Sequence, residues 1–170
     1  MLYEITVPQF IKMLKNLQNI LDKGATFAEV KKIDMEVLLN SRLAPDQFNL
    51  IRQVQIACDS AKLGAARIAG FDTPPPVHED IEKTLPELKR RIDDVIKYLE
   101  GIKSSDFAGA EQRKISQPRW EGKFLTGKEY ALEYALPNLY FHVTTAYAIL
   151  RHNGVEIGKK DYLGELPFKN

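Results

Sequence analysis

Residues 138–153 are the feature that most restricts the fold of this chain. Apolar side chains lie at almost every position between Leu139 and Leu150, so a helix formed there is apolar on nearly all of its sides. Such a helix is stable only when other helices cover it, because a helix at a protein surface needs a polar face. Asn153 and Gly154 then supply a helix stop. The segment therefore predicts the central helix of an all-α bundle.

Three earlier stretches have the helical period needed to surround this helix. Apolar residues recur at steps of three and four over residues 7–24, 45–70 and 84–102, which predicts three long amphipathic helices. Proline near the start and glycine near the end mark the first two of them. Together with the last helix, they predict a four-helix bundle that forms a single domain over residues 1–170.

The connections between these helices carry local signals of their own. A short helix is expected after Thr26, which opens a capping-box pattern. Its inward side chains are expected to be Phe27, Val30 and Ile33. Residues 104–124 break the helical period and predict a long crossover with a small β-hairpin before the last helix. A further box at 126–129 opens the last helical region, which Pro137 is expected to kink or restart.

Composition is that of an ordinary globular protein and excludes two classes of partner. Lys and Arg number 24 and Asp and Glu number 23, so the net charge of +1 is far from the strong positive charge of a nucleic-acid binder. The basic run at 89–91 has acids around it and is interpreted as a solvated helix face. No apolar run is long enough to cross a bilayer, and residues 1–4 have no signal-peptide character. A cytoplasmic protein with no nucleic-acid or membrane partner is expected.

Thiol and metal chemistry have little support in the residues themselves. Cys58 is the single cysteine, which excludes an intrachain disulfide, and its alanine-rich surroundings predict a small buried residue. His142 and His152 lie about 15 Å apart along one helix, too far to share an ion. His78 lies in a connection, and no His-x-x-x-His or Glu-x-x-His pair is present. No cofactor is therefore expected from the residues alone.

His142 is nevertheless unusual, because polar side chains are few in its helix. Asn138, His142 and Thr145 are spaced at i, i+4 and i+7, so they share one side of the helix. Gln55 and Asp59 form a second polar row on the second long helix. If that row faces inward, these two are the expected partners of His142 in a small polar pocket; if it faces water, it is a solvated face. His142 is either a pocket residue or a core histidine bonded across a helix interface.

Parts of the chain resemble a bacterial family of unknown function grouped with the DinB/YfiT-like metalloenzyme superfamily. The resemblance lies in residues 84–92, 136–154 and 158–164. It implies a four-helix bundle, often dimeric, with a divalent metal held by three histidines, one from the second helix and a His-x-x-x-His pair on the last. The first of that pair matches His142, but the second falls at Ala146, and the second-helix ligand falls near Gln55.

The sequence therefore supports three functional hypotheses for a protein that is expected to form a homodimer. The first is a DinB-like bundle with a degenerate metal site, in which Asn138, His142 and Thr145, with Gln55 and Asp59, line a cleft for a small molecule. The second is a hydrolase or transferase in which His142, with the same second-helix partners, holds a divalent metal such as Zn²⁺ or Ni²⁺. The third is a purely structural dimeric module.

Overall fold

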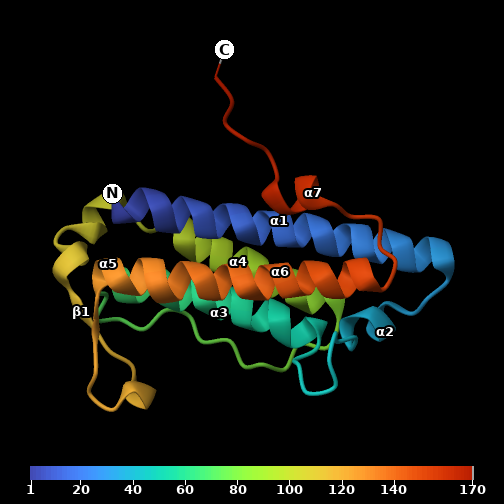
Figure 1. The fold of residues 1–170 in the computed structure, drawn as a ribbon, viewed down its shortest axis with the longest axis horizontal. Helices are drawn as coiled ribbons and strands as arrows, with labels where there is room; N and C mark the ends of the chain where they lie inside the picture. Colours follow the sequence, from blue (N-terminus) through green and yellow to red (C-terminus); the bar gives the residue numbers. More distant parts are fainter. Residues whose placement is uncertain (170) are drawn as a thin grey trace.

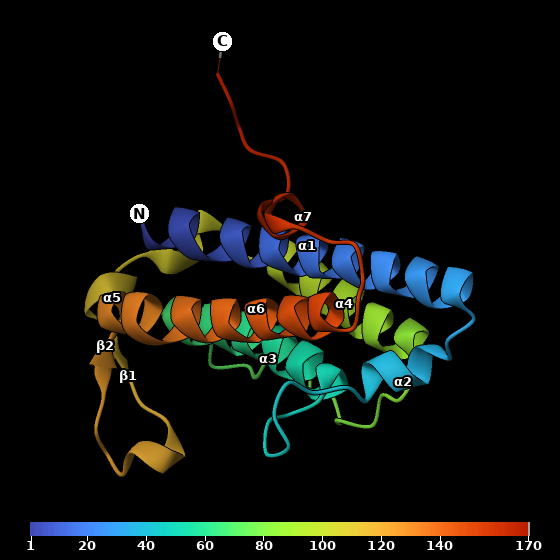
Figure 2. The ribbon, with the colours of Figure 1, turned by 45° about the vertical axis from the view of Figure 1, so that its right-hand side comes forward.

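Four long helices lie side by side within residues 1–169, the part of the chain that the computed structural model describes (Figures 1 and 2). They are α1 (Leu2–Lys31), α3 (Leu50–Ala69), α4 (Leu85–Glu100) and α6 (Leu136–His152). The shorter helices are α2 (Met35–Leu39), α5 (Gly127–Glu129) and α7 (Lys159–Leu163). The remaining elements are the 3₁₀ turns η1 (Ser104–Phe107), η2 (Ala110–Gln112) and η3 (Pro118–Trp120), the π-helical η4 (Tyr130–Ala135), and the strands β1 (Lys114–Ile115) and β2 (Leu125–Thr126). The all-α four-helix bundle predicted from the sequence is confirmed.

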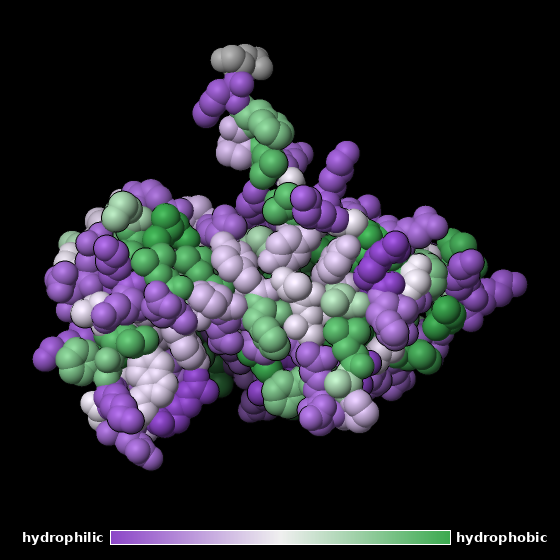
Figure 3. All heavy atoms as spheres, in the orientation of Figure 1, coloured by the Kyte–Doolittle hydropathy of each residue, from purple (hydrophilic) through white to green (hydrophobic). Residues whose placement is uncertain are grey.

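The core lies between the long helices and uses the apolar stripes that the helical period predicted. Its fully buried side chains include Phe10, Leu14, Leu17, Val54, Ile68, Leu88, Ile92, Val95, Leu139, Val143 and Ile149. α6 packs chiefly on α3 and α1, and its other face is open, since Phe141 is 56% exposed. The expectation that α6 is covered on every side is therefore wrong. Apolar side chains also reach the surface elsewhere, among polar ones (Figure 3).

No helix within residues 1–169 has the length and apolar character needed to cross a membrane. The longest, α1, carries polar side chains along its outer face and packs its apolar face on α4 and α6.

The first helix is longer than predicted, because it continues through Gly24. This glycine is buried, and a Cβ on it would lie 3.2 Å from Cδ2 of Leu150, so it permits close packing on α6 instead of ending the helix. Thr26 does not cap a new helix, since its hydroxyl donates to the carbonyl four residues earlier. The expected inward orientation also fails for Val30, which is 72% exposed, and for Ile33, which is 36% exposed.

The start of α3 differs from the sequence prediction, whereas the start of α6 agrees with it. α3 begins at Leu50 instead of Pro45, because the side chain of Asn49 caps it by accepting from the amide of Arg52 at 3.0 Å. The predicted restart at Pro137 is confirmed, because the α-helix α6 begins at Leu136 with Pro137 in its first turn, directly after the π-helical η4. Proline lacks the amide that would bond to the carbonyl four residues earlier, and the π-helical turns of η4 lie directly before it.

The crossover before α5 contains the predicted β-hairpin. β1 and β2 pair in antiparallel fashion, with Lys114 opposite Thr126. Thr126 also forms the predicted capping box, because the carboxylate of Glu129 accepts from its amide at 2.8 Å. The loop between the two strands includes η3, and it projects from the end of the bundle that holds α5 (Figure 2). The crossover thereby brings residues 117–119 against α3 and η4.

Candidate ligand-binding cleft

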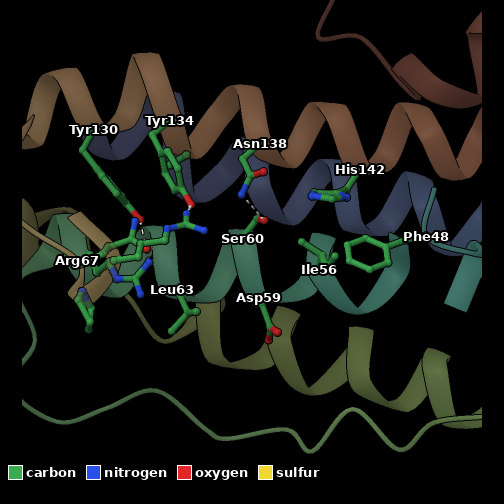
Figure 4. Close-up of a pocket in the computed structure, with 14 residues that line it drawn as sticks. Phe48, Ile56, Asp59, Ser60, Leu63, Arg67, Tyr130, Tyr134, Asn138 and His142 are labelled. Atoms are coloured by element: carbon green, nitrogen blue, oxygen red, sulfur yellow. Dashed lines mark hydrogen bonds between the residues drawn. The ribbon is translucent and has the colours of Figure 1, made fainter. Parts of the chain in front are cut away.

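A cleft of about 610 Å³ lies between α3 and the helical segment formed by η4 and α6 (Figure 4). Residues 117–119 of the crossover line one end of it, and Phe48 borders the other. Apolar side chains such as Ile56 and Leu63 alternate with polar ones along its wall. A cavity of this size with a few convergent polar groups is typical of small-molecule sites.

His142 reaches from α6 into this cleft and is held in one orientation. Its Nδ1 lies 2.7 Å from Oε1 of Gln53, so Nδ1–H donates and Nε2 remains as an acceptor. Burial lowers the pKa of His142 to about 4, and the positive charge of Arg52 acts in the same direction. The imidazole is therefore neutral at physiological pH. No hydrogen bond from residues 1–169 reaches its Nε2.

The polar stripe predicted on the last helix is only partly gathered in the cleft. Asn138 lines it one turn before His142, and its amide nitrogen donates to the hydroxyl of Ser60 at 3.0 Å. Thr145 lies outside, because its hydroxyl donates to the carbonyl of Phe141 at 2.8 Å within its own helix. The structure thus brings Asn138 and His142 together and leaves Thr145 apart.

The expected second-helix partners of His142 are wrong, because Gln53 takes their place. Gln55 is 3% exposed but faces the connection that precedes α4, where its amide nitrogen donates to Glu82 at 2.9 Å. Asp59 borders the cleft but turns its carboxylate the same way (Figure 4), toward Arg91 at 3.0 Å. Two residues along an α-helix are rotated by about 200°, so the side of α3 that meets α6 holds Gln53 and not Gln55.

Charged side chains between α3 and α4 form a network that the sequence analysis missed. Arg91 is 2% exposed and contacts Asp80 at 2.8 Å, Glu82 at 3.2 Å and Asp59 at 3.0 Å. Lys62 is 3% exposed, contacts Asp59 at 3.1 Å and donates to a carbonyl of the α3–α4 connection. The interpretation of residues 89–91 as a solvated face is therefore wrong for Arg91. The acids that precede α4 in the connection were the available signal.

Two stacked tyrosines form the end of the cleft opposite His142, and the sequence analysis missed them as well. The rings of Tyr130 and Tyr134 lie 5.3 Å apart with 28° between their planes. Nη1 of Arg67 donates to the Tyr130 hydroxyl at 3.0 Å, and Arg119 donates to the Tyr134 hydroxyl. Burial raises the pKa of Tyr130, so its hydroxyl stays protonated. The spacing of the two tyrosines by one helical turn was the signal that could have identified this end.

The residues around His142 do not fit a three-histidine metal site. Within residues 1–169, no three His, Cys, Asp or Glu side chains lie close enough together to hold a metal ion. Across the helix interface His142 meets the amide of Gln53, and one turn further along α6 the side chain is that of buried Ala146. Cys58 is fully buried as predicted, and burial raises the pKa of its thiol to about 12, so it is not a nucleophile.

We expect His142 in the folded protein to stay neutral and protonated on Nδ1 until the pH falls to about 4. The measurement is the ¹⁵N chemical shift of both ring nitrogens across a pH titration. The pKa of His142 is lowered from 6.5 to about 4, so the folded state binds fewer protons than the unfolded state in that window. The contribution of His142 should therefore lower the free energy of unfolding as the pH falls from 6.5 to 4. A Gln53→Leu variant should lose the fixed tautomer, and titration of the wild-type ring near pH 6.5 would contradict the assignment.

The fold and the cleft define a four-helix bundle protein with a ligand-sized cavity beside its last helix. The chain belongs to the family described as Domain of unknown function (DUF1993), whose model matches residues 2–163. It is also similar to a DinB family member protein from Shewanella denitrificans, known from a crystal structure. The identity is 66%, the TM-score is 0.97, and the match covers 100% of this chain and 96% of that chain. No curated protein matches the chain. The resemblance to a DinB-like family of unknown function is confirmed.

Proposed function

We propose that this protein binds a small organic molecule in the cleft between α3 and α6, with neutral His142 as a hydrogen-bond acceptor toward it. The observation that carries the proposal is the pairing of His142 Nδ1 with Gln53, which leaves Nε2 as an acceptor at a cavity of about 610 Å³. An acceptor that opens onto a cavity, and that no hydrogen bond from residues 1–169 reaches, can take a donor from a ligand. On this proposal the metal site of the superfamily is degenerate, with His142 as its one remaining histidine.

The fixed geometry around that acceptor also supports the proposal. Asn138 is held by Ser60 at 3.0 Å, one helical turn from His142, and both side chains line the same wall. A site whose side chains are already bonded in place loses little conformational entropy when a ligand binds. Thr145 and Gln55 have no part in it, because their polar atoms are bonded elsewhere.

Phenol is a suitable probe, because it offers one hydroxyl donor on an apolar ring. We expect phenol to shift the ¹⁵Nε2 resonance of His142. Toluene, which has no donor, should bind at least about fivefold more weakly than phenol, because about fivefold in affinity corresponds to the net contribution of one hydrogen bond. His142→Leu keeps similar bulk and should abolish the preference for phenol over toluene. If phenol leaves the resonances of the cleft unchanged, or binds equally well to His142→Leu, the proposal is wrong.

A divalent-metal-dependent hydrolase or transferase is the second candidate, favoured by one observation. A histidine with a pKa of about 4 has its lone pair available at neutral pH, which is the form that ligates Zn²⁺ or Ni²⁺. Of its neighbours, Gln53 offers only an amide oxygen, which is a weaker metal ligand than imidazole, and Ala146 has no ligand atom. We therefore expect only traces of metal in protein purified without metal-affinity resin or chelator. Elemental analysis of wild type and His142→Ala decides this: stoichiometric metal in the first that is lost in the second would establish the metalloenzyme.

Assembly as a homodimer and location in the cytoplasm stay predictions. The exposed Phe141 on the open face of α6 is compatible with self-association, since large exposed apolar side chains favour contact with another surface. A purely structural dimeric module would need no ligand, so the phenol measurement also separates that hypothesis from the proposed function.

A further inference from the structure

Two arginine side chains end beside each other at the tyrosine end of the cleft. Arg67 comes from α3 and Arg119 from η3 in the crossover. Each donates to one of the hydroxyls of Tyr130 and Tyr134, whose rings stack on one another (Figure 4). The two arginines therefore bond to neighbouring tyrosines, and both line the same end of the cleft. Each has further N–H donors that these single bonds do not use.

No acid balances these two positive charges. Within residues 1–169, neither Arg67 nor Arg119 has a carboxylate within 4.0 Å. Asp59 is the one acid that lines the cleft, and its carboxylate is engaged by Arg91 at 3.0 Å and Lys62 at 3.1 Å. A concave site with charge of one sign attracts and concentrates ions of the opposite sign. The charge balance at this end therefore favours an anion.

A buried amide at the same end also lacks a partner. Gln117 lines the cleft from the crossover and is only 8% exposed, yet its amide nitrogen has no hydrogen-bond acceptor within residues 1–169. An unpaired buried donor costs about 1–3 kcal/mol, and because this nitrogen is closed to solvent, an acceptor in the cleft reaches it only when the Gln117 side chain rotates. The Trp120 ring packs edge-on against Tyr134 at 5.5 Å and supports the tyrosine pair that lines this end.

From these contacts we infer that the tyrosine end of the cleft is an anion subsite, which takes the carboxylate or phosphate group of a small aromatic or apolar molecule. The guanidinium groups of Arg67 and Arg119 hold the anion by charge-assisted hydrogen bonds, which are the strong ones. The stacked rings of Tyr130 and Tyr134 contact the adjacent apolar part of the ligand. This inference rests on the proposed function, since it names the ligand class of the same cleft.

Benzoate, phenyl phosphate and benzamide test the subsite, because they share a ring and differ in charge. We expect benzoate or phenyl phosphate to bind at least about tenfold more tightly than neutral benzamide at low salt, and less tightly as NaCl is added. The tighter of the two anions identifies carboxylate or phosphate as the natural group. Calorimetry gives the affinities, and the NMR resonances of Tyr130 and Tyr134 show that binding is at this end.

Matched arginine variants show whether the two guanidinium groups are responsible. Arg67→Gln and Arg119→Gln should each lower the affinity for the anion about tenfold and leave that for benzamide unchanged, whereas Arg90→Gln, an exposed arginine on α4, should change neither. Arg119 is exposed, so its replacement keeps the fold. Equal binding of benzoate and benzamide, or anion binding that survives both replacements, overturns the subsite. The proposed function then still stands if phenol shifts the ¹⁵Nε2 resonance of His142, and it falls as well if phenol leaves the resonances of the cleft unchanged.

Discussion

Arg91→Leu should lower the free energy of unfolding by about 3 kcal/mol at pH 7, one of the two largest effects we expect for this protein. Arg91 is 2% exposed and is the common partner of Asp59, Asp80 and Glu82. Removing the cation leaves carboxylates without their partner in a partly buried place, which is costly even where the intact network adds little stability. We expect the lower end of the usual range, because Lys62 still contacts Asp59.

The pH dependence of this loss gives a second check on its cause. Burial raises the pKa of Asp80, but the hydrogen bonds from Arg91 and Arg52 together lower it by more. The pKa of Asp80 in the folded protein is therefore below its ordinary value of 3.8. A carboxyl whose pKa is lowered in the folded state stabilises it above the unfolded pKa and loses this effect as the pH falls. The penalty of Arg91→Leu should therefore shrink below about pH 4.

Urea unfolding of wild type and Arg91→Leu measures the loss, and Arg90→Leu is the matched control. Arg90 is exposed on the same helix and has no carboxylate within 4.0 Å in residues 1–169, so its replacement should change stability by less than about 0.5 kcal/mol. Equal, small effects of both replacements would show that the buried network does not stabilise the α3–α4 connection.

Gly127→Ala should be the second strongly destabilising change, with a loss of about 3 kcal/mol from forced overpacking. Gly127 is the first residue of α5 and packs against η2. A Cβ there would overlap the carbonyl oxygen of Ala110 and lie 3.0 Å from its carbonyl carbon. The clash is with backbone, which cannot rotate away, so α5 or the crossover must move. Because η4 continues from α5, the tyrosine end of the cleft should be displaced too.

Gly158→Ala is the control for this prediction. Gly158 also lies at the start of a short helix, α7, and a Cβ there meets no atom within 4 Å. Its replacement should leave the free energy of unfolding within about 0.5 kcal/mol of wild type. Thermal or urea unfolding of both variants tests the difference, and benzoate calorimetry on Gly127→Ala tests the displacement. A Gly127→Ala protein as stable as Gly158→Ala would contradict the prediction, because it would show that the crossover backbone moves to accept the Cβ at little cost in free energy.

The helices and their local boundaries follow from the sequence wherever the signal is contained within a few residues. The apolar periods over α3 and α4, the capping box at Thr126 and the hairpin in the crossover are all signals of this kind, and all three are confirmed. The error at Gly24 arose where a distant partner outweighed the local preference. At Gly24 that partner is Leu150, on another helix.

The composition of the cleft depends instead on how whole helices are rotated against one another. The sequence by itself determined a four-helix bundle with a polar histidine on its last helix. Only the tertiary structure decided that His142 meets Gln53, that Gln55 and Asp59 belong to the Arg91 network, and that Arg67 and Arg119 share one end of the cleft. The physical reason is that helical periodicity fixes which residues share a face, whereas long-range packing fixes which neighbour that face meets.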